Sequence, residues 1–151
     1  STDIAAGQLV DRAGVAMGLG FPSGPALEAL TEGAAPQKGF AVRVENARFS
    51  LSGMENKVRE LLERGAPHED AAMFVVATLT RTILRATRQA LERYPGLPVL
   101  CAGGVMSNRT LQRAMQDAFG AYIAPAVYAS DNALGTALLA AVRAGEDIWT
   151  L

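Results

Sequence analysis

A short apolar segment followed by two glycines is the feature that most constrains how this chain folds. Residues Val99 to Ala102 form an uninterrupted apolar run, which is typical of a strand in a parallel sheet that is covered on both faces. After Gly103 and Gly104, apolar residues recur at four-residue steps from Leu111 to Phe119. A second strand over 122–124 and a helix over 131–143 come next. The order strand, helix, strand, helix predicts an α/β fold.

The preceding part of the chain is predicted to be mainly helical, with one β-hairpin. Apolar residues recur at three- and four-residue steps over 3–19, 25–30 and 67–93, and a further helix follows Gly53. Residues 40–52 instead alternate apolar and polar side chains, with a turn at Glu45-Asn46-Ala47, so they are expected to form a β-hairpin. In the last helix, three residues are expected to face inward: Leu134, Leu138 and Val142.

Length and charge bound the number of domains and the kinds of partner. With 151 residues, half of them hydrophobic, the chain makes one domain, or one lobe of a larger fold, with a sizeable core. Its 14 Lys and Arg against 15 Asp and Glu give a net charge of -1, so no overall positive field draws it to nucleic acid or to an acidic membrane. No apolar stretch approaches the roughly 20 residues that span a bilayer.

The single cysteine and the single histidine exclude several kinds of catalytic site. Cys101 is surrounded by apolar residues and is predicted to be a buried, reduced thiol, which fits the cytoplasm. Because His68 is the only histidine, the chain cannot build a paired-histidine metal site by itself. We therefore assign both residues to structure rather than to catalysis.

The segment from Cys101 to Arg109 is the first candidate binding site. Glycines let a backbone approach a ligand closely, and free amides at a helix N-terminus favour an anion such as phosphate. The alternative is an ordinary glycine turn in which Ser107 or Asn108 caps the following helix. The spacing leaves both interpretations open, because it matches neither a Walker loop nor a GxGxxG pattern.

Two aspartates are further candidates. Asp131 opens the last helix just past a strand, at the sheet edge where α/β proteins bind ligands, but aspartate is also a common helix cap. Asp11 lies on the first helix and precedes the breaker-rich loop Phe21 to Pro25; by itself, such a carboxylate would usually belong to a solvated face. Residues Ser50 to Gly53 form either another close-approach loop or simply the end of the hairpin.

Five sequence motifs together resemble one family over nearly the whole chain: the tRNA threonylcarbamoyladenosine transferases, long labelled O-sialoglycoprotein endopeptidases or glycoproteases. They stand in the order and at about the intervals found in that family. The motifs are AAGQLVDR (5–12), FPSGPALE (21–28), RFSLSGMENKV (48–58), CAGGVMSNRTL (101–111) and SDNALGTAL (130–138).

The resemblance implies a fold and an extent. Members of the family have the two-lobed fold of actin and the heat-shock chaperone ATPases, which is ribonuclease H-like, and this chain resembles the C-terminal portion. Residues 1–151 would thus be a single C-terminal lobe containing a β-hairpin and parallel strands packed with helices. The N-terminal lobe is absent from it, and we expect a natural full chain to carry that lobe.

The resemblance also implies site residues. Asp11 matches the aspartate that binds the ribose of the ligand, Gly24 the glycine of the loop lining the same site, and Asn108 the asparagine after the glycine pair. Gly103 and Gly104 match the backbone beside the nucleotide. Asp131 matches the aspartate that ligates an active-site iron or zinc, together with two histidines of an HxxxH motif on the N-terminal lobe.

In the family, the ligand is ATP or the threonylcarbamoyl-adenylate, and the threonylcarbamoyl group moves to N6 of adenosine 37 in tRNA. The metal would act as a Lewis acid and as a template for the carbamoyl group. Since this chain supplies at most one ligand of that metal, we expect it to hold metal poorly and to be inactive by itself.

Two departures from the family pattern are compatible with a divergent paralogue whose ligand or partner has changed. The family usually has a lysine in its SFSGLKT motif where this chain has Glu55, and an acidic residue near a nucleotide or tRNA would weaken anion binding. The family's DNAAM motif reads Asp131-Asn132-Ala133-Leu134-Gly135 here. The basic surface expected of a tRNA binder is also not evident in a net charge of -1.

Three functions follow from these observations. The leading hypothesis is the nucleotide-binding C-terminal part of a transferase, and the alternative is a non-catalytic paralogue that serves as a binding or assembly module for a superfamily partner. The inherited metallo-glycopeptidase label is the weakest, because the chain offers no complete hydrolytic site. We also expect an apolar patch around Ser52, Gly103 and Asp131 that drives homodimer formation.

Overall fold

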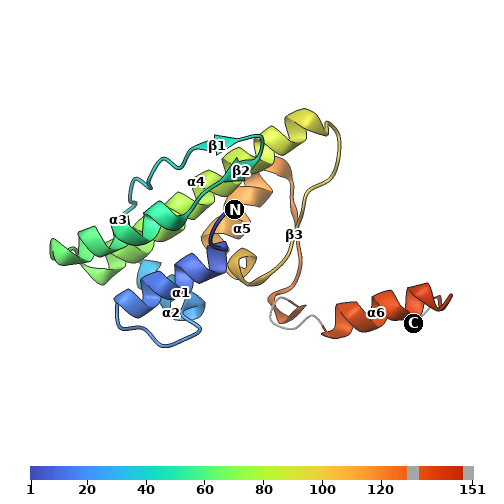
Figure 1. Cartoon of the computed structure of the whole chain (residues 1–151), viewed down its shortest axis with the longest axis horizontal. Helices are drawn as coiled ribbons and strands as arrows, with labels where there is room; N and C mark the ends of the chain where they lie inside the picture. Colours follow the sequence, from blue (N-terminus) through green and yellow to red (C-terminus); the bar gives the residue numbers. More distant parts are fainter. Residues whose placement is uncertain (129–132, 148–151) are drawn as a thin grey trace.

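The computed structural model describes residues 1–128 and 133–147 and shows a mixed α/β architecture (Figure 1). Within these residues, helices dominate and the two sheets have two strands each. The α-helices are α1 (Ala6–Ala16), α2 (Gly24–Thr31), α3 (Ser52–Glu63), α4 (His68–Arg93), α5 (Arg109–Phe119) and α6 (Ala133–Arg143). The strands are β1 (Val44–Glu45), β2 (Arg48–Phe49), β3 (Leu100–Cys101) and β4 (Tyr122–Ile123), and 3-10 turns occupy η1 (Gly104–Ser107) and η2 (Ala126–Tyr128).

The long helix α4 joins two hydrophobic cores. Its N-terminal half contributes Ala72, Val75 and Val76 to a core shared with α1, α2 and α3, where Leu9 and Leu27 are almost fully buried. Its later turns pack Ile83 and Leu84 against a second core, whose buried members are Cys101, Leu111, Met115 and Ala121. The helical stripe expected over 67–93 is confirmed, and the helix ends, as predicted, before Tyr94-Pro95-Gly96.

The predicted hairpin is confirmed, although its strands have only two residues each. Val44 pairs with Phe49 and Glu45 with Arg48 in antiparallel register. The two turn residues, Asn46 and Ala47, have φ angles of 50° and 60°, as the type I′ turns that match strand twist require. The hairpin lies along α4 (Figure 1).

A single glutamine fixes the hairpin to α4. The side-chain amide of Gln89 donates to the carbonyl oxygen of Val44 at 3.0 Å and accepts from the N–H of Ala47 at 3.0 Å. One side chain thereby pairs a backbone carbonyl oxygen and a backbone N–H group for which such a short sheet has no partner.

The β3–β4 pair is parallel, as predicted, but it is not covered on both faces. Leu100 stands beside Tyr122 and Cys101 beside Ile123. Cys101 belongs to the second core, whereas Leu100 and Tyr122 are 73% and 68% exposed. The expectation of a strand covered on both faces was therefore wrong for the described residues. An apolar run shows that a strand is suited to burial, but it does not show that other elements cover both of its faces.

The last helix forms but does not turn its apolar residues inward. Leu138, Leu139 and Val142 are 37%, 69% and 48% exposed, and α6 stands apart from the rest of the described chain (Figure 1). The prediction that Leu138 and Val142 face a core was wrong, and Leu134 lies outside the side chains that the structure describes. None of the described helices is long and apolar enough to cross a membrane.

Candidate functional site

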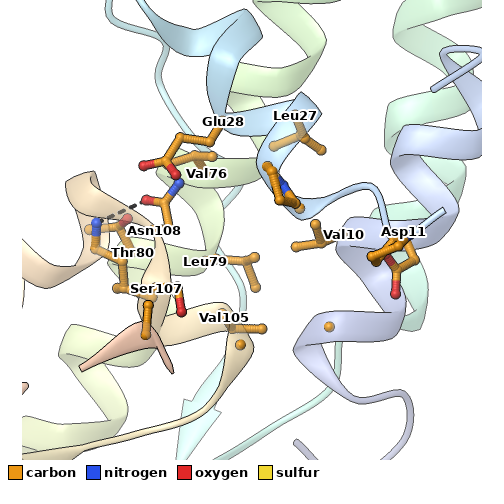
Figure 2. Close-up of a pocket in the computed structure, with 17 residues that line it drawn as sticks. Val10, Asp11, Leu27, Glu28, Val76, Leu79, Thr80, Val105, Ser107 and Asn108 are labelled. Carbon is orange, nitrogen blue, oxygen red and sulfur yellow. Dashed lines mark hydrogen bonds between the residues drawn. The ribbon is translucent and has the colours of Figure 1, made fainter. Parts of the chain in front are cut away.

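A pocket of about 460 Å³ lies between α1, α2, α4 and the η1–α5 segment. Its size falls within the range usual for small-molecule sites. Figure 2 places Val10 and Asp11 on one side and Glu28, Thr80, Ser107 and Asn108 on the other. Apolar side chains from several elements complete the lining, among them Leu27, Val76, Leu79 and Val105.

The structure brings four of the predicted binding residues to this one pocket. Asp11 lies on α1, Gly24 on α2, Gly104 on η1 and Asn108 at the N-cap of α5, and all four line the pocket. Gly103 is not among the lining residues. Its φ of 103°, at the point where the chain passes from β3 to η1, is a backbone angle that glycine adopts readily and other residues rarely adopt. The glycine pair therefore leads into a 3-10 turn before α5 begins, and not directly into the helix.

Asp11 holds the loop that follows α1. Its carboxylate accepts a hydrogen bond from the N–H of Ser23 at 2.9 Å. The Ser23 hydroxyl donates to the carbonyl oxygen of Gly20 at 2.9 Å, and the residue is fully buried. A Cβ on Gly14 would lie 2.2 Å from that of Ser23, so glycine at 14 permits the close approach. Asp11 is thus not the solvated carboxylate that the sequence alone suggested.

Asn108 is the cap of α5, as one of the sequence interpretations predicted. Its side-chain oxygen accepts from the N–H of Leu111 at 3.1 Å. Because the same residue lines the pocket, capping and ligand binding are compatible here. The side-chain NH2 group remains on the other end of the amide as a donor.

Glu28 is a pocket residue that the sequence analysis missed. Its carboxylate accepts from the N–H of Arg109, the first residue of α5, at 2.7 Å. A carboxylate is favoured at a helix N-terminus, because the unpaired amides and the helix dipole are positive there. Its spacing was a usable signal, since residue 28 stands four positions after Gly24 and so shares a helix face with it.

Thr80 is the second lining residue that the sequence did not single out. Its hydroxyl oxygen is buried and has no hydrogen-bond partner among the described residues. The neighbouring threonines differ, because Thr78 and Thr82 both donate to carbonyl oxygens one turn earlier, at 2.7 Å. The unsatisfied hydroxyl of Thr80 therefore costs free energy that the other two do not.

Comparison with known proteins decides the family. The model of the TsaD family, tRNA N6-adenosine threonylcarbamoyltransferase, matches residues 1–138. The chain belongs to the TsaD family. Proteins with that name from Thermus thermophilus and Archaeoglobus fulgidus are 34% and 33% identical to it over 146 and 135 residues. A relative from Chlorobium chlorochromatii is 28% identical over 164 residues.

This TsaD-family chain is short beside its relatives. The three alignments cover 91%, 86% and 93% of it, but only 44%, 42% and 47% of the respective relatives. The chain thus spans less than half the length of the curated proteins that it matches.

Glu55, the acidic departure from the TsaD motif, does not lie in the pocket. Its carboxylate pairs with Arg12 at 2.8 Å and with Arg59 at 3.6 Å. It therefore joins α3 to α1 at the surface, and it is not among the lining residues. The expectation that this residue weakens nucleotide binding directly finds no support in the geometry.

The described residues offer no metal centre. They hold no group of three or more His, Cys, Asp or Glu side chains placed to bind an ion. Asp131, the predicted ligand, lies outside the described residues. Cys101 is buried, as predicted, and burial raises the pKa of its thiol, which keeps it protonated and unreactive at neutral pH.

Proposed function

We propose that the chain is the nucleotide-binding C-terminal part of a tRNA threonylcarbamoyltransferase, in which the pocket beside α5 takes the adenosine portion of ATP or of an adenylate. The observation that carries the proposal is the convergence of Asp11, Gly24, Gly104 and Asn108 on one pocket. Membership of the TsaD family supplies the reaction class.

Each of these residues has a role that its chemistry suits. The Asp11 carboxylate would accept hydrogen bonds from the ribose hydroxyls, since an ionised carboxylate is an acceptor only. Gly24 and Gly104 would let the backbone lie close to the ligand. Val10, Leu27 and Leu79 would pack against the face of the base and keep water from it.

The remaining parts of the proposal concern the whole protein. We propose that the chain forms one lobe of an actin-like fold, that a further lobe contributes to the reaction, and that tRNA binds to the complete protein. Metal chemistry requires ligands beyond those of the described residues, so we derive no step through a metal. The isolated chain is accordingly proposed to bind ligand without turnover.

A role as an assembly module is the second candidate, and it rests on a separate observation. Leu100, Tyr122, Val127 and Leu139 are all at least 68% exposed. Exposed apolar groups of this kind, when contiguous, mark surfaces that associate with other proteins. Such a role would not require an occupied pocket.

Calorimetric titration of the chain with adenosine tests the proposal. The wild-type chain should bind with one-to-one stoichiometry, and Asp11→Asn should bind more weakly while keeping an oxygen that accepts from the Ser23 N–H. Asp117→Asn, which changes an exposed aspartate on α5 outside the pocket, is the matched control and should bind like the wild type. Absence of binding by the wild-type chain would leave the assembly role as the better account.

A further inference from the structure

Positive charge is concentrated on one surface of the chain, although the net charge of the whole chain is -1. This surface consists of the second half of α4, residues 81–93, and of the segment 38–49 that runs along the helix. Its cations are Lys38, Arg43, Arg48, Arg81, Arg85, Arg88 and Arg93, and its carboxylates are Glu45 and Glu92. Seven positive charges against two negative ones give this basic surface a net charge of +5.

Close contacts hold the two parts of the basic surface together. A Cβ on Gly39 would lie 2.5 Å from the backbone nitrogen of Thr78, so the segment passes directly against α4 at that point. The next residue, Phe40, donates its N–H to the Thr78 hydroxyl at 2.7 Å. Gln89 then bonds the hairpin. The segment therefore follows α4 from Thr78 to Gln89, about 16 Å along the helix axis (Figure 1).

Three arginines form an unpaired stripe at the centre of this surface. Arg81, Arg85 and Arg88 stand at steps of four and three residues, so they share one face of α4 and span about 10 Å of it. All three are exposed, and among the described residues none of them forms an ion pair with a carboxylate. Their guanidinium groups are therefore open to an external anion, and the planar fork of arginine donors matches phosphate oxygens.

The stripe faces away from the pocket. On α4, the side chains that line the pocket are Val76, Leu79 and Thr80. The three arginines lie roughly 150° around the helix axis from those side chains, because each residue of an α-helix advances by about 100°. None of the cations of the basic surface lines the pocket. The basic surface is therefore a second candidate site, on the opposite side of α4.

An aromatic ring at the same surface indicates which anion it fits. Phe40 is 39% exposed, and its bond to Thr78 places it one helical turn before Arg81. Sites for single-stranded nucleic acid combine cations that follow the phosphates with aromatic rings that stack on the bases. An acidic polypeptide would pair with the cations but has no base to stack on the ring.

We propose that the basic surface binds a single-stranded RNA segment, with Arg81, Arg85 and Arg88 contacting the phosphate backbone and Phe40 stacking on a base. The inference rests on the proposed function, which gives the whole protein an RNA substrate. It names the surface of this chain that meets the RNA and separates that surface from the nucleotide pocket.

Fluorescence anisotropy with a labelled single-stranded oligoribonucleotide tests the proposal. The wild-type chain should bind it, and the dissociation constant should rise steeply with salt concentration, because phosphate contacts release counterions. Arg85→Gln should weaken binding severalfold and lower the slope of log affinity against log salt concentration by about 0.7 to 1. Phe40→Leu should weaken binding and leave that slope unchanged, since stacking does not depend on counterion release.

Arg64→Gln is the matched control. Arg64 is exposed at the C-cap of α3, just before the start of α4, which lies about 20 Å from Arg81 along the helix. This variant should keep the wild-type affinity and salt slope. Equal losses in Arg85→Gln and Arg64→Gln would overturn the proposal, because they would show attraction to net charge alone. Polyglutamate that competes as well as unlabelled RNA would also overturn it, by assigning the surface to an acidic polypeptide.

Calorimetric titration with adenosine separates this inference from the proposed function. Arg85→Gln should bind adenosine as the wild-type chain does, because Arg85 lies outside the pocket. If the wild-type chain binds adenosine but not the oligoribonucleotide, the inference fails and the nucleotide-binding proposal stands. If it binds the oligoribonucleotide but not adenosine, the RNA surface stands and the nucleotide-binding proposal fails.

Discussion

The Asp11 carboxylate accepts the backbone N–H of Ser23 at 2.9 Å, and this bond connects α1 to the loop that opens α2. Because Ser23 is fully buried, its N–H has no access to solvent as an alternative partner. One side chain therefore both lines the pocket and holds the loop that opens α2.

Two substitutions of Asp11 measure what its bond to Ser23 contributes to stability. Asp11→Ala should lower the free energy of unfolding by about 1–3 kcal/mol, because it leaves a buried N–H unsatisfied. Asp11→Asn should lower it less, since an amide oxygen still accepts that bond. Urea unfolding measures both effects. Equal stability of the Ala and Asn variants would show that the bond to Ser23 contributes little.

Thr80 and Thr78 allow the free-energy cost of a buried hydroxyl without a partner to be compared with the contribution of one that is hydrogen-bonded. Thr80→Val should raise the free energy of unfolding of the ligand-free chain by about 1 kcal/mol, because it removes an unsatisfied group. Thr78→Val should lower it by a similar amount, because the Thr78 hydroxyl both donates to Phe74 and accepts from the N–H of Phe40 at 2.7 Å. Thermal melts of the two variants should move in opposite directions; a fall for both would mean that Thr80 has a partner in solution.

The hydrogen bonds of the Asp3 carboxylate should make the stability of the chain depend on pH. Its carboxylate accepts hydrogen bonds from the Ser50 hydroxyl and the N–H groups of Leu51 and Ser52, and these hold its pKa well below the usual value of 3.8. Since the folded-state pKa is the lower one, the stabilisation is complete above the unfolded pKa and is lost as the pH falls from about 4 toward the folded pKa.

Asp3→Asn should therefore destabilise the chain at pH 7 and do so less at pH 3, because the wild-type chain loses part of the same stabilisation there. Chemical unfolding at the two pH values measures the difference. A gap between wild type and variant that stays constant with pH would contradict the role assigned to the ionised carboxyl group.

The exposed apolar groups of β3, β4 and α6 predict self-association. We expected an apolar patch around Ser52, Gly103 and Asp131. Asp131 lies outside the described residues, and the large exposed apolar residues include Leu100, which shortly precedes Gly103, together with Tyr122 and Leu139. Light scattering should show an average mass that rises with concentration, and Leu139→Lys should reduce that rise. Val15→Lys changes another exposed apolar residue, on α1, and should not reduce it. A monomer at every concentration would count against an associating surface.

The sequence predicted elements well where a periodic pattern and a local stop signal agreed. The long helix ends before Tyr94-Pro95-Gly96, and the turn at Asn46 and Ala47 was located from the alternation on either side of it. Burial of a whole face was harder to predict, because it depends on what packs against it. Leu100 and Val142 have the residue types of a core and are nevertheless exposed.

The same distinction applies to the candidate site. Asp11, Gly24, Gly104 and Asn108 were found through motifs, and the structure brings them together. Glu28 and Thr80 were missed, because their significance arises from contacts between elements distant in sequence: Glu28 meets an amide 81 positions away. The spacing of Glu28 from Gly24 indicates a shared helix face, but no local pattern shows that the residue fills a distant helix end or that Thr80 leaves a hydroxyl without a partner.

The most direct test of the central claim is an NMR titration of the labelled chain with adenosine that follows the amides of Gly24, Gly104 and Asn108. Asn108→Ser, which keeps a capping oxygen for α5 but removes the amide NH2 group, is the informative variant. The account predicts saturable shifts at these amides in the wild-type chain and weaker binding in the variant. Unchanged shifts up to millimolar adenosine, or shifts confined to residues outside the pocket, would contradict it.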